Sequence, residues 1–142
     1  MNRVRCVLIS LVIFIFAGCT VSFAADRTVV SEAEVVSGGD LLISREMLEN
    51  TKKGNTYDFS YIFKYVDEYI EEADYAVVNL ETSIGGKALG YSGFPWFNTP
   101  ESIVTAAENA GFDMFLTASN HSYDQGYKAA VSTSILPSVH EI

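Results

Sequence analysis

The chain has 142 residues, of which 49% are hydrophobic, enough for one domain with a modest core. Its 18 acidic residues outnumber nine basic ones, and setting aside Arg3 and Arg5 at the N-terminus leaves a net charge of −11 on the rest. So acidic a surface, with no basic stripe, repels nucleic acid and anionic lipid, and this excludes a nucleic-acid-binding function.

Residues 1–25 have the order of a secretory signal: two arginines, then an apolar run over residues 7–17, then small residues. Three endings fit this segment. Cys19 lies in a lipobox-like stretch and would be lipidated, Ala24 ends an ordinary signal-peptidase site, and residues 6–25 carry no charge and could stay as an uncleaved anchor. Each ending exports the domain, either to the outer face of the cell membrane or as a secreted protein.

The first half of the exported part predicts one strand and two helices. Residues 26–34 are polar and form a tether, and residues 35–40 read as a strand that ends in a glycine turn. Residues 44–53 have helical composition and end in two lysines and a glycine. The clearest helix is expected over residues 59–70, where apolar side chains recur at helical spacing and Asp58 is available as the N-cap.

The second half predicts a strand, a helix and a strand. Residues 75–80 are a short apolar run that suits a strand covered on both faces, and a long loop rich in glycine and aromatic residues follows over residues 81–99. Thr99 then caps a helix that Gly111 ends, and residues 112–118 supply the next strand. This βαβ order predicts an α/β fold with a parallel sheet.

Polar residues follow each expected strand. Asp40 follows the first, Asn79 and Glu81 the second, and Asn120 and His121 the third. The carboxyl ends of parallel strands meet at one edge of a sheet, so we expect these side chains to converge there. Oxygen and imidazole ligands in that position predict a site for a divalent metal that activates water for hydrolysis of a phosphoester or similar bond.

Each of these motifs also has a plainer interpretation. Asp40 and Glu81 are common in turns and caps, and His121 also fits a solvated loop. Asp124 would join the site or cap the following helix. The four aromatic residues in the segment 91–97 form either a lid over the site or a satellite core.

Five motifs carry a family resemblance, and they stand in this order: Gly39-Asp-Leu-Leu, Tyr57-Asp-Phe-Ser, Val78-Asn-Leu-Glu-Thr82, Tyr91-Ser-Gly-Phe-Pro and Ala118-Ser-Asn-His-Ser. Together they resemble the bacterial CapA family, the poly-γ-glutamate capsule synthesis proteins. The resemblance covers residues 35–126. It implies a calcineurin-like, metallophosphatase-type α/β sandwich outside the cell, attached to the membrane. It also implies membrane proteins of polyglutamate synthesis as partners, with an anionic polymer nearby.

The resemblance also assigns roles to the site residues. Asp40, Asn79, Glu81 and Asn120 would bind a divalent metal such as manganese, zinc or iron, and His121 would donate a proton to the leaving group. Two alternatives stay open: a non-catalytic, membrane-attached scaffold that binds polymer or partner proteins, and a general phosphatase unrelated to capsule.

The family pattern also predicts that this domain is incomplete. Residues 132–142 do not match the expected continuation, so we expect residues 35–142 to be a partial domain, the N-terminal half of the sandwich. A sheet without its second half would have an open apolar face and edge. We therefore expect a marginally stable chain with weak or no catalysis.

Overall fold

The computed structural model describes residues 29–139, so the expectations for the signal segment and Cys19 lie outside the described residues. The chain divides into two units, Met1–Glu32 and Ala33–Ile142, and the second contains all the helices and strands described here. Residues 29–34 are exposed and belong to no helix or strand. None of the helices between residues 29 and 139 has the length and apolarity that a membrane crossing requires.

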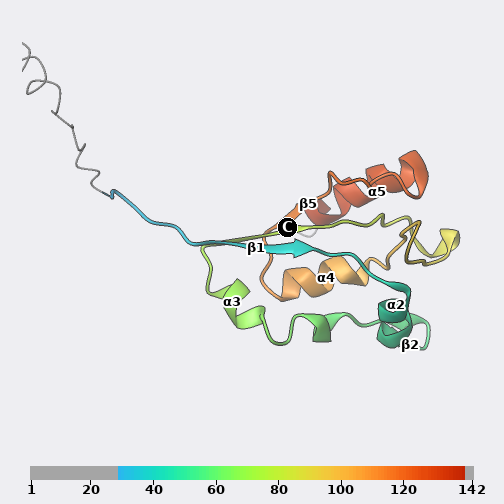
Figure 1. Ribbon diagram of the computed structural model, residues 1–142, viewed down its shortest axis with the longest axis horizontal. Helices are drawn as coiled ribbons and strands as arrows, with labels where there is room; N and C mark the ends of the chain where they lie inside the picture. The colour runs from blue at the N-terminus through green and yellow to red at the C-terminus, as the bar shows by residue number, and fades with distance from the viewer. Residues whose placement is uncertain (1–28, 140–142) are drawn as a thin grey trace, which may run out of the picture. The chain divides into compact units, whose positions relative to one another are not determined.

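Three short parallel strands form the sheet that positions the site. They are β1 (Val35–Asp40), β4 (Tyr75–Asn79) and β5 (Met114–Leu116), in the order β1-β4-β5 (Figure 1). The connections between them contain α3 (Asp67–Glu71) and α4 (Ser102–Asn109), as parallel pairing requires. The expected α/β class with a parallel sheet is thereby confirmed, while the sandwich stays a prediction.

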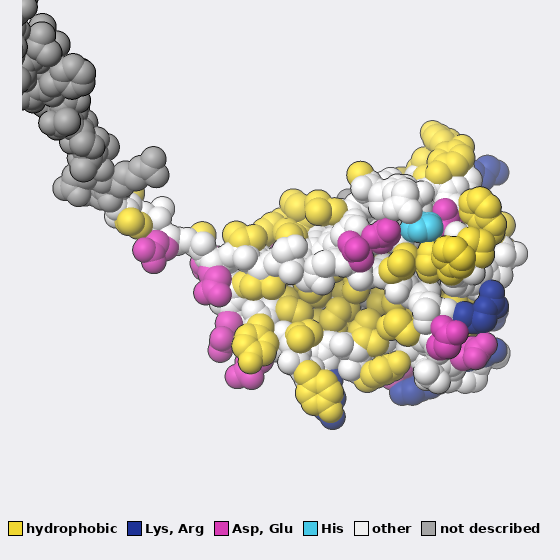
Figure 2. All heavy atoms as spheres, in the orientation of Figure 1, with side chains coloured by type: hydrophobic (Ala, Val, Ile, Leu, Met, Phe, Trp, Pro, Cys, Tyr) yellow, Lys and Arg dark blue, Asp and Glu magenta, His cyan; other side chains and the backbone are white. Residues whose placement is uncertain are grey.

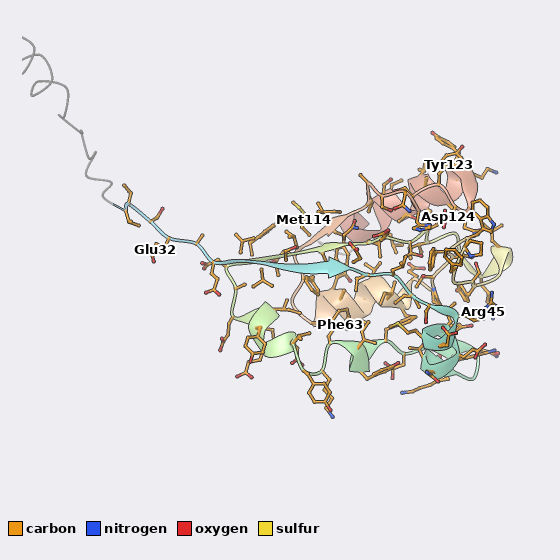
Figure 3. The ribbon with its side chains drawn as sticks, in the orientation of Figure 1. Glu32, Arg45, Phe63, Met114, Tyr123 and Asp124 are labelled. Carbon is orange, nitrogen blue, oxygen red and sulfur yellow. The ribbon has the colours of Figure 1, made fainter. Side chains whose placement is uncertain are left out.

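Only one face of the sheet is fully buried, which corrects the expectation that the strand over residues 75–80 is covered on both faces. Ala76 and Val78 are buried in β4, whereas Val77 between them is half-buried. Neighbouring side chains on a strand point to opposite faces, and the core packs on one of them. Met114 lies on the other face and stays 41% exposed; Figure 3 shows it on the opposite side of the sheet from Phe63.

The first helix, α2 (Arg45–Thr51), starts one residue later than expected. The Ser44 side chain caps it by accepting a hydrogen bond from the Met47 amide at 3.2 Å. The helix ends before the two lysines because β2 (Lys52–Lys53) turns back and pairs with β3 (Thr56–Tyr57) in a small antiparallel hairpin.

The continuous helix expected over residues 59–70 is wrong. The segment forms a single 3₁₀ turn, η1 (Ser60–Ile62), and then α3, with Val66 at a non-helical φ of −129° between them. Asp58 is not the N-cap, because that position is taken by Phe59, which makes no side-chain cap hydrogen bond. The Oδ1 atom of Asp58 nevertheless accepts hydrogen bonds from the Ser60 amide and hydroxyl. Aromatic and β-branched residues are weak helix formers, so the burial of individual side chains decides the local backbone.

The apolar stripe of this segment is split accordingly. Phe59, Phe63 and Ile70 are buried, but Val66 and Tyr69 are 45% and 69% exposed. Both exposed side chains line a hollow between this segment and β1.

The connection between β4 and β5 agrees with the sequence at one end only. Gly111, with a φ of +99°, follows α4 as its expected stop. Thr99 is not the N-cap, because its hydroxyl lies 2.8 Å from the Thr82 hydroxyl and α4 starts later, at Ser102. The last helix is α5 (Gly126–Val139); in Figure 1 it lies on the other side of the sheet from α3 and α4.

The core fills the space between the sheet and the α3–α4 side. Its large buried side chains come from β4, from α4 and from the segments that connect the three strands; they include Ile43, Phe59, Phe63, Val78, Leu80, Ile103, Val104 and Phe112. Gly38 is needed where β1 crosses this core, because a Cβ there would lie 2.5 Å from the Phe112 ring.

Candidate functional site

The residues predicted to form the site lie at or beyond the carboxyl ends of the strands. Asp40 ends β1 and pairs in register with Asn79, which ends β4 and pairs with Leu116 at the end of β5. The edge continues past the strands, since the Leu80 amide donates to the Leu116 carbonyl at 2.8 Å. Parallel pairing therefore brings Asp40 and Asn79 to one edge of the sheet, with Glu81 beside them. Asn120 and His121 lie in the loop after β5, and their convergence with this edge stays a prediction.

Asp40, Asn79 and Glu81 form a carboxylate–amide cluster at this edge. The Asn79 side-chain nitrogen donates to Asp40 Oδ1 at 2.8 Å and to Glu81 Oε2 at 3.3 Å. Asp40 is exposed, and the other two side chains are half-buried. The Asn79 amide thus binds two carboxylates, Asp40 at the end of β1 and Glu81 just after β4, and keeps them beside each other.

The donor set of this cluster fits a hard divalent cation. Two carboxylates placed together repel each other unless a donor or a cation lies between them. A half-turn of the Asn79 amide exchanges its nitrogen for its oxygen, after which all three residues present oxygen atoms, the ligands that such cations prefer. Within residues 29–139, however, no three His, Cys, Asp or Glu side chains group together so that they could hold a metal ion. The full predicted ligand set, with Asn120, stays a prediction.

His121 lies in a loop that is fixed by short hydrogen bonds. The Ser122 hydroxyl donates to the Thr117 carbonyl at 2.6 Å and accepts from the Ser119 amide at 2.8 Å. The His121 carbonyl accepts from the Ser83 hydroxyl at 3.0 Å, which joins this loop to the segment after β4. Asn120 is exposed beside it. Figure 2 shows the histidine and a group of acidic side chains on the same face of the domain.

The imidazole of His121 is paired with a carboxylate. Its Nδ1 lies 2.8 Å from Asp124 Oδ2, and the two side chains are 17% and 6% exposed. No hydrogen bond joins this pair to the carboxylate–amide cluster in the described part of the chain. The sequence alone left Asp124 open between the site and a helix cap; the structure puts its carboxylate on His121.

The aromatic segment 91–97 is part wall and part surface. Phe97 is buried, and its ring meets the His121 imidazole edge-on, with 4.6 Å between the ring centroids. Phe94 and Trp96 are 76% and 62% exposed. Burial of Phe97 beside His121 agrees with the satellite-core interpretation for that residue. A lid formed by the exposed Phe94 and Trp96 stays a prediction.

Burial also changes the chemistry of one residue in this segment. Tyr91 packs edge-on against Tyr57, with 5.1 Å between the ring centroids. Burial, followed by the negative potentials of Tyr57 and Glu101, raises the pKa of the Tyr91 hydroxyl. Tyr91 therefore keeps its proton and acts as a neutral packing group.

Sequence reasoning missed a buried polar layer under the site. Thr82, Ser83, Asn98 and Thr99 are fully buried, and their side chains bond to one another or to backbone. The Asn98 side chain accepts from the Gly85 amide and donates to the carbonyls of Gly86 and Gly90, which shapes the long loop. Small polar residues in a glycine-rich stretch usually indicate an exposed loop, so the sequence carried no signal of this burial.

Two hollows adjoin the candidate site. One, of about 380 Å³, is lined by Phe94, Phe97, Arg45 and neighbouring residues of the chain before and within α2. It shares Phe97 with His121, and its charged side chains are Arg45 and Glu46. A larger apolar hollow of about 550 Å³ lies between β1 and the η1–α3 segment, where Figure 2 shows hydrophobic side chains, and Asp40 is its one link to the cluster.

Comparison with known proteins identifies one family. The family model for bacterial capsule synthesis protein PGA_cap matches residues 34–136, well over half of the chain. The matched residues include the carboxylate–amide cluster, the aromatic segment and the His121–Asp124 pair. No curated protein matches the chain. No solved structure matches it either.

Proposed function

Because the chain belongs to the family of bacterial capsule synthesis proteins, we propose that it serves the synthesis, export or anchoring of a γ-linked glutamate capsule. Association with capsule synthesis follows from the family itself. That the capsule polymer is γ-linked glutamate is our proposal. In this account the N-terminal segment exports the domain and holds it at the outer face of the cell membrane. Membrane proteins of capsule synthesis are its partners there.

The proposed chemistry is metal-assisted hydrolysis, and it rests on the convergence of Asp40, Asn79 and Glu81. These residues and Asn120 would hold a divalent cation such as manganese, zinc or iron. When bound, such a cation supplies Lewis acidity and lowers the pKa of a coordinated water. His121 would then donate a proton to the leaving group, a role that suits an imidazole held at one nitrogen and open at the other.

The hollow beside His121 suits an anionic substrate. Arg45 lines it, and no salt bridge of Arg45 forms among residues 29–139. Phosphate and carboxylate groups both match the guanidinium fork. The strongly acidic remainder of the domain makes this side chain one of few groups that can hold an anion near the site.

Metal content of the full-length chain tests the proposed chemistry. We expect stoichiometric manganese, zinc or iron in the wild type and its loss in Asp40→Ala. Glu68→Ala, which removes an exposed carboxylate in α3, is the matched control and should keep the metal. Equal metal content in all three proteins, or none in the wild type after supplementation, would refute the metal site.

A non-catalytic scaffold is the second candidate, and the exposed aromatic side chains favour it. Phe94 and Trp96 project from the segment that lines the Arg45 hollow, and exposed aromatics of this kind are typical of binding surfaces. Binding of γ-glutamyl polymer by metal-free protein, lost in Trp96→Ala and kept in Asp40→Ala, would favour the scaffold. A general phosphatase would instead cleave simple phosphoesters and ignore the polymer.

A further inference from the structure

We propose that Asp124 is the positioning residue of His121: it fixes the imidazole in the tautomer that carries its proton on Nδ1 and leaves Nε2 open. This inference rests on the proposed function: Nε2 takes up a proton from water, which makes the ring an imidazolium, and then gives that proton to the leaving group. Asp124 itself need not touch the substrate, because it would act through the imidazole.

The pairing geometry determines the tautomer. An ionised carboxylate only accepts hydrogen bonds, so the 2.8 Å contact between His121 Nδ1 and Asp124 Oδ2 needs the proton on Nδ1. In a neutral ring the other nitrogen, Nε2, then keeps its lone pair. With its side chain only 6% exposed, Asp124 holds this bond largely shielded from competing water.

A second donor keeps the carboxylate in place. The backbone amide of Phe97 donates to the same Oδ2 atom at 2.7 Å, so the oxygen that meets His121 is anchored from a segment 27 residues away. Two hydrogen bonds on one oxygen leave the carboxylate little freedom to rotate. Asp124 lies in the turn two residues before α5 begins, and Figure 3 shows it close to that helix.

The imidazole is held in orientation as well as in tautomer. The Phe97 ring packs edge-on against it with an interplanar angle of 79°, and the His121 amide donates to the Ser119 hydroxyl at 3.2 Å. Phe97 thus acts twice, through its amide on Asp124 and through its ring on His121. A carboxylate that served only to tie the aromatic segment to α5 would not need the imidazole at all.

Nitrogen-15 NMR of the imidazole side chains in the full-length protein, recorded above neutral pH, separates these two roles without any activity assay. His121 is assigned by its loss in His121→Gln. We expect wild-type His121 to be protonated at Nδ1, and Asp124→Ala to shift it toward the Nε2-protonated form that free imidazole side chains favour. Tyr123→Ala, an exposed neighbour on the same loop, should leave the wild-type pattern unchanged.

Asp124→Asn covers the case in which the alanine variant fails to fold. The Phe97 amide and His121 Nδ1 share one carboxylate oxygen, so the amide oxygen of the Asn variant can accept from both, and we expect the proton to stay on Nδ1. The proton on Nε2 in wild type or in the Asn variant, or a folded alanine variant with the wild-type pattern, would overturn the inference. Each of these results leaves the metal-content test of the proposed function intact, and loss of metal binding would not alter the tautomer result.

Discussion

The side-chain nitrogen of Asn79 lies 2.8 Å from Asp40 Oδ1 and so joins the ends of two neighbouring parallel strands. In the absence of a cation, this amide stabilises the carboxylates on either side of it by donating a hydrogen bond to each. The contact therefore makes the stability of the edge sensitive to what occupies the cluster.

Replacing this amide with an acid should make the fold dependent on divalent metal. Asn79→Asp removes the bridging donor and puts three carboxylates together, which we expect to cost about 1–3 kcal/mol in the free energy of unfolding without metal. Manganese should restore much of that loss. Thermal unfolding in chelator and in manganese measures both effects. A variant that melts like wild type in chelator, or that gains no stability from manganese, would argue against the cluster.

The hydroxyl pair of Thr82 and Thr99 should show strong coupling, because both side chains are fully buried and the two oxygens lie 2.8 Å apart. Thr99→Val leaves the Thr82 hydroxyl with only a 3.4 Å contact to a carbonyl, and we expect a loss of about 1–3 kcal/mol. The double variant with Thr82→Val should lose less than the sum of the single variants. Strict additivity in urea unfolding would contradict this pairing.

The ion pair of Lys53 with Asp58 should make stability depend on pH in the acid range. The Lys53 ammonium and then the Ser60 donors hold the pKa of Asp58 well below its ordinary value of 3.8. A lowered folded-state pKa stabilises the protein above the unfolded-state value, and this stabilisation is lost as the pH falls below 3.8. Asp58→Asn should thus unfold at lower urea than wild type at pH 7, with a smaller difference at pH 3. An equal difference at both pH values would contradict the assignment.

Local signals in the sequence predicted the ends of elements well where one residue decides the outcome. Gly111 stops α4 as predicted, because a positive φ acts within a few residues. The helix expected from Ser44 begins one residue later, with the Ser44 hydroxyl as its cap. Thr99 looked like an equally good cap. Its hydroxyl instead forms a hydrogen bond with the hydroxyl of Thr82, which is 17 residues away in the sequence. No local sequence pattern predicts a contact over that distance.

The part of the candidate site that depends only on parallel strand pairing was predictable from the sequence. Once residues 35–40 and 75–79 are parallel strands, Asp40 and Asn79 must share an edge, and they do. The expected helix at residues 59–70 failed because tertiary burial of Phe59 and Phe63 overrode helical periodicity. The Phe97 amide donates a hydrogen bond to the Asp124 carboxylate and so joins two loops. Because the donor is a backbone group, the side-chain types in the sequence do not reveal this contact.

The most direct test of the account is paramagnetic NMR of the full-length chain titrated with Mn²⁺. We predict that one equivalent selectively broadens the signals of Asn79 and the His121 imidazole, and that Asp40→Ala abolishes the effect while Glu68→Ala does not. Broadening that is spread evenly over the acidic surface, or that persists in Asp40→Ala, would contradict a metal site at the carboxyl edge of the sheet.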